Sequence, residues 1–191
     1  NILLPLFMPR TKTFDENLVL EKAMELFWEK GYAATSIQDL VDHLGINRAS
    51  LYDTYGEKDQ LYQKAFELYR KKNTLGIQEF LNNEPDVRTG LKRLFETTIR
   101  ESVEDRARKG CFVVNTTTEL IPGHPEMLPV LTENKARIEQ VFLDYLKKAE
   151  SEGQIDPGKD LDAIASLLFT IFSGLKVVAK IDTRKESLSQ T

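Results

Sequence analysis

The chain is poor in cysteine, with one cysteine, two histidines and one tryptophan among its 191 residues. A single cysteine cannot form an internal disulfide, which excludes a secreted fold stapled by disulfides, and we expect a cytoplasmic protein. The longest uncharged apolar run, residues 163–175, is too short to cross a bilayer, so we expect no membrane partner. Residues 1–7 lack the basic start and cleavage site of a signal peptide, and we expect residues 1–8 to be a disordered or non-native leader.

The sequence also lacks the motifs of common enzyme active sites. It contains no P-loop, dinucleotide-binding glycine pattern, nucleophile elbow or His-Glu-x-x-His pair. His43 has no cysteine or carboxylate pair beside it at metal-ligand spacing, and His124 lies in a Pro-Gly-His-Pro turn. We therefore expect no catalytic site, no metal and no cofactor, although a small helical enzyme and a helical protein-interaction scaffold remain alternative interpretations.

Apolar residues recur at spacings of three and four, and stretches that alternate apolar and polar residues are scarce. The chain is 41% hydrophobic and 29% charged, which is enough to bury a core. These patterns indicate an all-α fold. Glycine, proline and capping residues delimit helices that we expect at residues 13–30, 36–44, 47–55, 58–72, 87–104, 112–120, 125–152 and 160–181.

Residues 36–56 form a helix-turn-helix pattern. Ser36 and Asp39 have the spacing of a capping box, Gly45 permits a tight reversal, and Asn47 is a suitable N-cap for the next helix. We expect an N-terminal three-helix helix-turn-helix domain, which binds DNA, at residues 9–57. Residues 58–191 then form a second, helical domain.

The formal net charge of the chain is −4, and residues 9–60 hold 6 Lys or Arg against 10 Asp or Glu. A DNA-binding function therefore depends on individually placed donors rather than on overall attraction. The residues at the start of the second helix of the pattern are suited to base edges: Asn47, Arg48, Ala49 and Ser50. Phosphate donors are expected at Thr35, Ser36, Tyr52, Thr54, Tyr55 and Lys58, with Arg10 and Lys12 in the lead-in segment. For each single residue, a solvated surface position or a core tyrosine is the alternative.

Residues 13–61 resemble the DNA-binding domain of the TetR/AcrR (tetracycline-repressor) family of bacterial transcriptional regulators. The resemblance is carried, in one unbroken register, by Leu20, Ala23, Leu26, Phe27, Gly31, Tyr32, Thr35, Ser36, Ile37, Asp39, Leu40, Gly45, Ile46, Leu51, Tyr52, Tyr55, Lys58 and Leu61. It implies that Tyr52 and Lys58 touch operator phosphates and that residues 47–50 enter the major groove. Family members often carry an aromatic or histidine pair where this chain has Asp53 and Thr54, which leaves the operator sequence open.

The resemblance further implies a ligand-responsive repressor that binds a palindromic operator as a homodimer. Its second domain would bind a small-molecule effector and dimerise, with two C-terminal helices per subunit in a four-helix interface. The chain stops at Thr191, where the second such helix would start, so we expect the final helix to be missing. The apolar segment at 160–181 supplies the expected dimer contacts, Ile164, Leu168, Ile171, Leu175 and Val178.

Two further sites are expected in the second domain. Amphipathic position and mixed composition suggest a pocket for a small, partly apolar ligand at Phe95, Thr98, Phe112, Asn115, Thr116, Phe142, Phe169 and Phe172, with no cluster of charge that names the ligand. Cys111 follows Arg106, Arg108 and Lys109, and this electropositive helix start resembles family members that sense electrophiles through cysteine. Cys111 is therefore a candidate redox sensor, although a lone cysteine is more often a small buried apolar residue.

Overall fold

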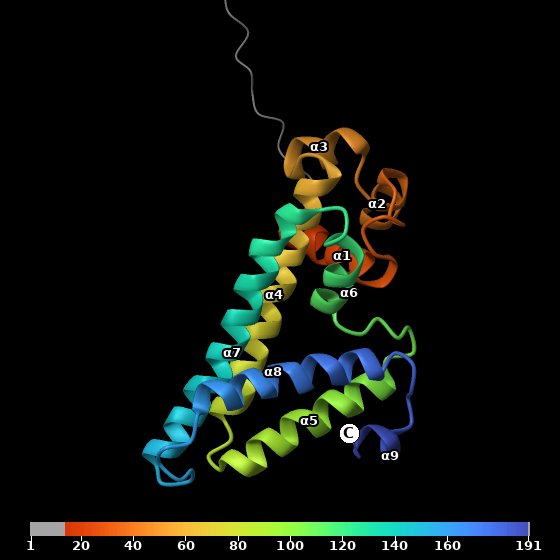
Figure 1. Ribbon diagram of the computed structural model, residues 1–191. Helices are drawn as coiled ribbons and strands as arrows, with labels where there is room; N and C mark the ends of the chain where they lie inside the picture. The colour runs from red at the N-terminus through yellow and green to blue at the C-terminus, as the bar shows by residue number, and fades with distance from the viewer. Residues whose placement is uncertain (1–13, 191) are drawn as a thin grey trace, which may run out of the picture.

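The computed structural model describes residues 14–190, in which every regular element is helical (Figure 1). Three predictions fall outside these residues: the leader at residues 1–8, the lead-in donors Arg10 and Lys12, and the helix cap Thr13. The all-α prediction is confirmed. The elements are α1 (Glu16–Lys30), α2 (Ile37–Leu44), α3 (Arg48–Tyr55), α4 (Lys58–Asn82), α5 (Val87–Glu104), α6 (Phe112–Leu120), the 3₁₀ helix η1 (Pro125–Met127), α7 (Leu128–Ser151), α8 (Leu161–Val178) and α9 (Lys185–Leu188).

Side-chain caps fix the starts of the first three helices. The predicted start of α1 at Thr13 is wrong, because the Asp15 carboxylate caps the helix and accepts hydrogen bonds from the Asn17 and Leu18 amides at 2.9 and 3.2 Å. The predicted capping box of α2 is confirmed, since Ser36 and Asp39 bond each other's backbone amides.

The turn between α2 and α3 depends on its glycine. Gly45 has a φ of 69°, in the left-handed region that residues with a Cβ rarely enter, and it ends α2. Asn47 then caps α3 by accepting a hydrogen bond from the Ser50 amide at 2.8 Å, as predicted.

Among the later helices, two differ most from the prediction, and α8 (Leu161–Val178) also ends before the predicted residue 181. α4 has 25 residues and continues to Asn82, because Ile77 and Leu81 extend its buried stripe beyond residue 72. The predicted helix at 125–152 divides into η1 and α7, with Pro125 at the start of η1.

The buried residues form two main clusters. The first unites α1, α2 and α3 with the first half of α4, α6 and the start of α7, and its centre is an aromatic group around Tyr62. The ring centroid of Tyr62 lies 5.0 Å from those of Phe27 and Tyr32 and 5.7 Å from that of Phe112. The second cluster joins the end of α4 to α5, α7 and α8. The division between residues 57 and 58 stays a prediction, and the first cluster holds residues from both sides of it.

α4 and α7 run side by side along the molecule and connect the two ends (Figure 1). Arg70 of α4 is buried, and its guanidinium lies 2.8 Å from Glu67 on its own helix and 2.9 Å from Glu133 on α7. α6 packs against α4, and its buried residues belong to the same core cluster as those of α1, α2 and α3, so it is in contact with the helix-turn-helix end.

α8 is apolar on most of its surface and little buried. Its 18 residues have a mean hydropathy of 1.8 and only 22% of them are buried, so by length and composition it could cross a membrane. Helices that pack in protein interfaces have the same composition. Its exposed apolar side chains are Leu167, Ile171 and Val177.

Candidate DNA-reading surface and interdomain cavity

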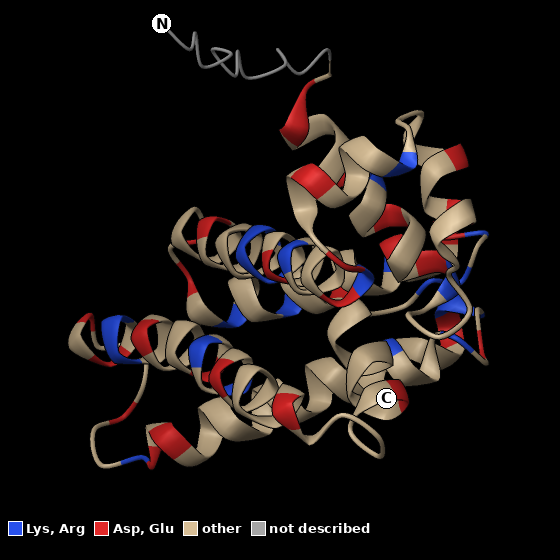
Figure 2. Ribbon diagram, turned by 90° about the horizontal axis from the view of Figure 1, so that it is seen from above, with Lys and Arg blue, Asp and Glu red and all other residues tan. Residues whose placement is uncertain are grey.

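The start of α3 is presented to solvent by the packing of its neighbours. Leu40 and Leu44 of α2 and Leu51 of α3 are buried together, which holds the two helices at a fixed angle. Asn47, Arg48 and Ala49 are exposed as a result, and Ser50 is partly exposed. Viewed from above, this three-helix end carries more acidic than basic segments (Figure 2). Arg48 is therefore one of few cations available there, as the sequence predicts.

Contacts on α2 orient the outer side chains of this surface. The Arg48 guanidinium donates to Gln38 Oε1 at 3.4 Å, and Gln38 in turn donates to Asp42 at 2.8 Å. Asp39 accepts from Ser36 and forms a 2.9 Å ion pair with Lys30 at the end of α1. These hydrogen bonds from Ser36, and then that from Lys30, hold the pKa of Asp39 well below its ordinary value.

Two predicted phosphate donors must be corrected. Thr35 is fully buried, and its hydroxyl donates to the Gly31 carbonyl at 2.6 Å. Tyr55 is also buried, its hydroxyl donates to the Glu16 carbonyl at 2.7 Å, and burial raises its pKa to about 12. The Tyr55 bond joins α3 to the start of α1, and the Thr35 bond closes the segment between α1 and α2, so both hydroxyls make internal bonds instead of facing DNA.

The other predicted phosphate donors remain accessible to differing extents. Ser36 is exposed, while Tyr52, Thr54 and Lys58 are partly exposed around the ends of α3 and the start of α4. Lys58 Nζ lies 4.2 Å from the ring centroid of Tyr32. Their contacts with phosphate stay predictions.

A carboxylate of α6 is bonded to the segment that leads into α2. The amides of Tyr32 and Ala33 donate to Glu119 at 3.1 and 2.7 Å. Gly31 has a φ of 86°, and a Cβ there would lie 2.9 Å from the Glu119 carboxylate. Glycine at position 31 is thus needed both for its backbone conformation and for the close approach of Glu119.

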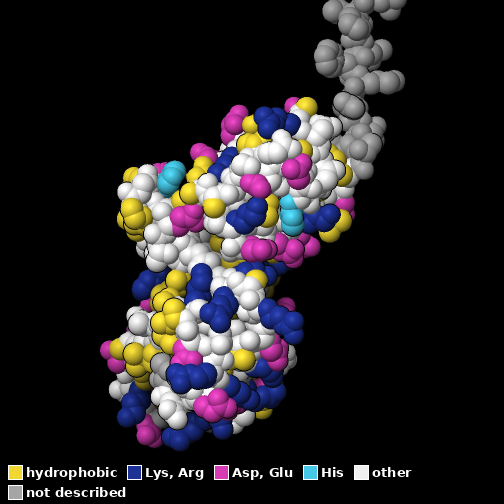
Figure 3. All heavy atoms as spheres, turned by 90° about the vertical axis from the view of Figure 1, so that its right-hand side faces the viewer, with side chains coloured by type: hydrophobic (Ala, Val, Ile, Leu, Met, Phe, Trp, Pro, Cys, Tyr) yellow, Lys and Arg dark blue, Asp and Glu magenta, His cyan; other side chains and the backbone are white. Residues whose placement is uncertain are grey.

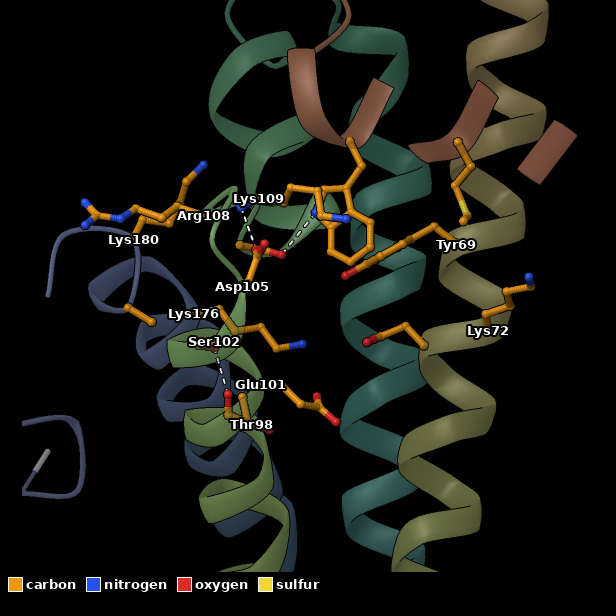
Figure 4. Close-up of a pocket in the computed structure, with 15 residues that line it drawn as sticks. Tyr69, Lys72, Thr98, Glu101, Ser102, Asp105, Arg108, Lys109, Lys176 and Lys180 are labelled. Carbon is orange, nitrogen blue, oxygen red and sulfur yellow. Dashed lines mark hydrogen bonds between the residues drawn. The ribbon is translucent and has the colours of Figure 1, made fainter. Parts of the chain in front are cut away.

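A cavity of about 510 Å³ lies between α1 and the second domain (Figure 4). Met24 and Trp28 reach it from α1, and Tyr69 reaches it from α4. Basic side chains outnumber acidic ones in its lining. The cations are Lys72, Arg108, Lys109, Lys176 and Lys180, and the acids are Glu101 and Asp105.

Trp28 and the segment before α6 form the wall on the DNA-binding side. Trp28 Nε1 donates to the Gly110 carbonyl at 3.0 Å, and Lys109 Nζ lies 4.5 Å from the indole ring. The Lys109 amide donates to Asp105 at 2.7 Å, and the Lys180 ammonium donates to Asn115 at 3.0 Å. In the space-filling view, basic side chains gather where the lower lobe meets the upper one (Figure 3).

A second cavity of about 230 Å³ is mainly apolar. Val113, Val114, Ile138, Phe169 and Phe172 contribute its apolar lining. Asn73 and Lys176 line both cavities, so the two lie next to each other.

Most of the predicted ligand residues lie elsewhere. Thr98 lines the larger cavity, and Phe169 and Phe172 line the smaller one. Phe112 and Phe142 are buried in the two core clusters instead, and Phe95 packs on Phe172. Thr116 is fully buried against the Tyr62 hydroxyl at 2.7 Å, and Asn115 bonds to the Lys109 carbonyl. The sequence pattern indicates only the part of the basic cluster at Arg108 and Lys109, because its other members come from two separate segments.

Cys111 is buried at the start of α6 and lines the smaller cavity. The Tyr69 hydroxyl donates to its sulfur at 3.8 Å, and burial raises the pKa of Tyr69. Arg106 and Arg108, which the sequence places just before it, are exposed. The role of Cys111 as a redox sensor stays a prediction.

The predicted dimer residues on α8 divide into two groups. Leu175 faces inward, where it is buried with Ile99, Ala179 and Leu188, and this assignment is wrong. Ile171 is 41% exposed, and Ile164, Leu168 and Val178 are partly exposed. The outer face also contains Leu167 and Val177, which were not among the predicted dimer contacts.

An exposed helix-turn-helix joined to a helical domain with a ligand-sized cavity defines the class of two-domain DNA-binding regulators. Comparison with known proteins identifies the family. The family model for bacterial regulatory proteins of the tetR family matches residues 19–65, and that for the tetracyclin repressor-like C-terminal domain matches residues 86–191. The chain therefore belongs to the TetR family, whose members are transcriptional regulators and not enzymes.

The similarity to individual proteins extends over nearly the whole chain. It is 34% identical to the HTH-type transcriptional regulator YezE of Bacillus subtilis (strain 168), over 95% of this chain and 94% of YezE. It is 29% identical to the HTH-type transcriptional repressor ComR of Escherichia coli (strain K12), over 95% and 87% of the two chains. A cysteine mutant of the TetR family regulator CifR, solved with a 26-bp double-strand operator, has a TM-score of 0.82 at 26% identity over 95% and 94%.

Proposed function

We propose that this regulator is a cytoplasmic repressor that binds a palindromic operator as a homodimer and is released by a small molecule. The observation that carries the proposal is the exposed start of α3, with Asn47, Arg48 and Ala49 free of the core and Arg48 at its outer edge. The operator-bound CifR structure, which shares the fold, supports the same orientation toward DNA.

Arg48 is assigned to base edges, and Ser36, Tyr52, Thr54 and Lys58 to the flanking phosphates. Arginine reads guanine in the major groove with two hydrogen bonds, and such a contact contributes about 1–3 kcal/mol of discrimination. The phosphate donors fix the register of the reading helix without reading sequence.

The apolar outer face of α8 is assigned to the dimer interface. Leu167, Ile171 and Val177 are 58%, 41% and 47% exposed on one helix, which a monomer would leave in contact with water. Two copies related by a two-fold axis would cover this face and place two reading helices about 34 Å apart, one turn of DNA.

α6 is assigned to the connection between cavity and operator. The N-terminus of α6 follows Gly110, whose carbonyl accepts a hydrogen bond from Trp28 beside the cavity. The last turn of α6 carries Glu119, which accepts a hydrogen bond from Ala33 in the segment before α2. An effector that displaces α6 would therefore move the reading helices, with a coupling free energy of about 1–3 kcal/mol typical of such systems.

Selection of genomic fragments by the purified full-length protein, repeated over a salt series, tests the proposal. We expect an enriched palindrome whose affinity falls steeply with salt, because each phosphate contact releases counterions. No enrichment by a folded, dimeric protein would refute operator binding and favour a scaffold role.

A further inference from the structure

We propose that the effector is an amphipathic anion, a small molecule with one carboxylate or phosphate group on an apolar body, bound across the two adjoining cavities. This inference rests on the proposed function, because it names the ligand class of the same regulatory domain. The anionic group lies in the larger cavity and the apolar body in the smaller one.

The charge of the larger cavity argues for an anion. Five basic side chains line it against two acidic ones. Asp105 is already engaged by the amides of Ala107 and Lys109 at 3.2 and 2.7 Å. Within residues 14–190, Arg108, Lys109, Lys176 and Lys180 form no ion pair. Cations gathered without a carboxylate partner repel one another, and an anion among them would offset that repulsion.

The basic side chains come from different elements, so their meeting is a property of the fold. Lys72 is on α4, Arg108 and Lys109 precede α6, and Lys176 is on α8. Figure 4 shows Lys109 and Lys176 on the side of the cavity near Asp105, Lys72 on the opposite side, and the side chains of Arg108 and Lys180 extending outward from its rim. Lys72 is paired with Glu21 of α1, which leaves Lys109 and Lys176 as the centre of the anion-binding group, with Arg108 and Lys180 at its rim.

The smaller cavity argues for an apolar body. Its walls are mainly aliphatic and aromatic, and it adjoins the cationic cavity at Asn73 and Lys176. Lys176 Nζ lies 4.2 Å from the ring centroid of Phe172, so this lysine packs on an aromatic wall and also lines the cationic cavity. A ligand spanning this boundary would place its charged end beside Lys176 and its body against Phe169 and Phe172.

The sole tryptophan of the chain makes the site measurable, since Trp28 lines the larger cavity and Lys109 lies over its ring. The probes are octanoate and octyl phosphate, with octanamide and octanol as neutral counterparts of the same chain length. Binding is followed by calorimetry and by Trp28 fluorescence on the full-length protein, without DNA. We expect the anions to bind at least about tenfold more tightly than their neutral counterparts and to change Trp28 emission.

Variants locate the site. Lys109→Gln with Lys176→Gln should weaken anion binding about tenfold or more, while Lys92→Gln with Lys147→Gln, two exposed lysines on α5 and α7, should leave it unchanged. The control pair has the same net charge, so a loss shared by both pairs would mean nonspecific attraction and overturn the proposal. Preference for octanoate over octyl phosphate, or the reverse, identifies the head group.

Equal binding of charged and neutral probes, or no binding of either anion, would overturn the inference. Neither result would affect the test of operator binding by fragment selection. Anion binding by a protein that enriches no operator would leave the anion site in place and refute the repressor function. If the protein binds both the anion and the operator, adding the anion should release the operator. Unchanged operator affinity would overturn the assignment of this site to the effector.

Discussion

The Ala33 amide donates a 2.7 Å hydrogen bond to the Glu119 carboxylate, and this contact joins the second domain to the entrance of the helix-turn-helix. Tyr32 donates to the same carboxylate from the preceding residue. The position of α2 and α3 therefore depends on where α6 lies.

Replacing Glu119 with alanine should loosen this connection. Two backbone amides would lose a charged acceptor, which water replaces in part, so we expect about 1 kcal/mol of lost stability and weaker coupling between effector and operator. The measurement is operator affinity with and without effector, alongside thermal melting. Glu29→Ala, at an exposed position on α1, is the matched control, and unaltered coupling in the Glu119 variant would contradict a role for α6.

Thr35 and Tyr55 should prove to be structural residues. Thr35→Val and Tyr55→Phe remove buried hydrogen bonds to Gly31 and Glu16, and each should cost about 1 kcal/mol of stability. Urea titration measures that loss, and operator affinity should hold at temperatures where the variants are folded. A drop in affinity without a drop in stability would restore these residues as DNA contacts.

The outer face of α8 should control the oligomeric state. Leu167→Glu with Ile171→Glu places two charges in the proposed interface, and we expect the dimer dissociation constant to rise about a hundredfold or more. Sedimentation velocity over a concentration series measures it. Leu75→Glu, at a side chain 54% exposed on α4, is the control. An unchanged dimer would move the interface to another surface.

Asp39 should contribute to the acid sensitivity of the DNA-binding end. Hydrogen bonds from Ser36 and Lys30 lower its pKa below the ordinary 3.8, so its stabilising effect is present above that pH and is lost as the pH falls toward the lowered pKa. Asp39→Asn should therefore flatten the loss of stability on the acid side. Asp53→Asn, exposed on α3, is the control, and identical acid profiles for wild type and Asp39→Asn would contradict the assignment.

Local signals in the sequence were sufficient to predict the helix-turn-helix. Ser36, Gly45 and Asn47 act through neighbours a few residues away, so their caps and turn follow from spacing alone. The start of α1 was misplaced because Thr13 and Asp15 both offer a plausible cap two residues apart.

The regulatory site could not be predicted in the same way. Trp28, Lys72, Lys109 and Lys180 meet only after α1, α4 and α8 have packed around the segment before α6, and no local pattern connects them. Likewise, the burial of Leu175 depends on which side of α8 faces its neighbours, and that of Thr35 on how the segment between α1 and α2 folds back on Gly31. Because α8 is apolar on nearly all sides, its sequence pattern does not show which side is buried.

The most direct test of the central claim combines one protein variant with operator variants in a thermodynamic cycle. Each base pair of the selected half-site is changed in turn, and affinity for wild type and Arg48→Ala is measured by fluorescence anisotropy at fixed salt. If Arg48 reads a base pair, changing that pair should cost the wild type about 1–3 kcal/mol and the variant almost nothing, with other positions unaffected. Equal costs for both proteins at every position would contradict base reading by Arg48 and place the recognition of the operator on other residues.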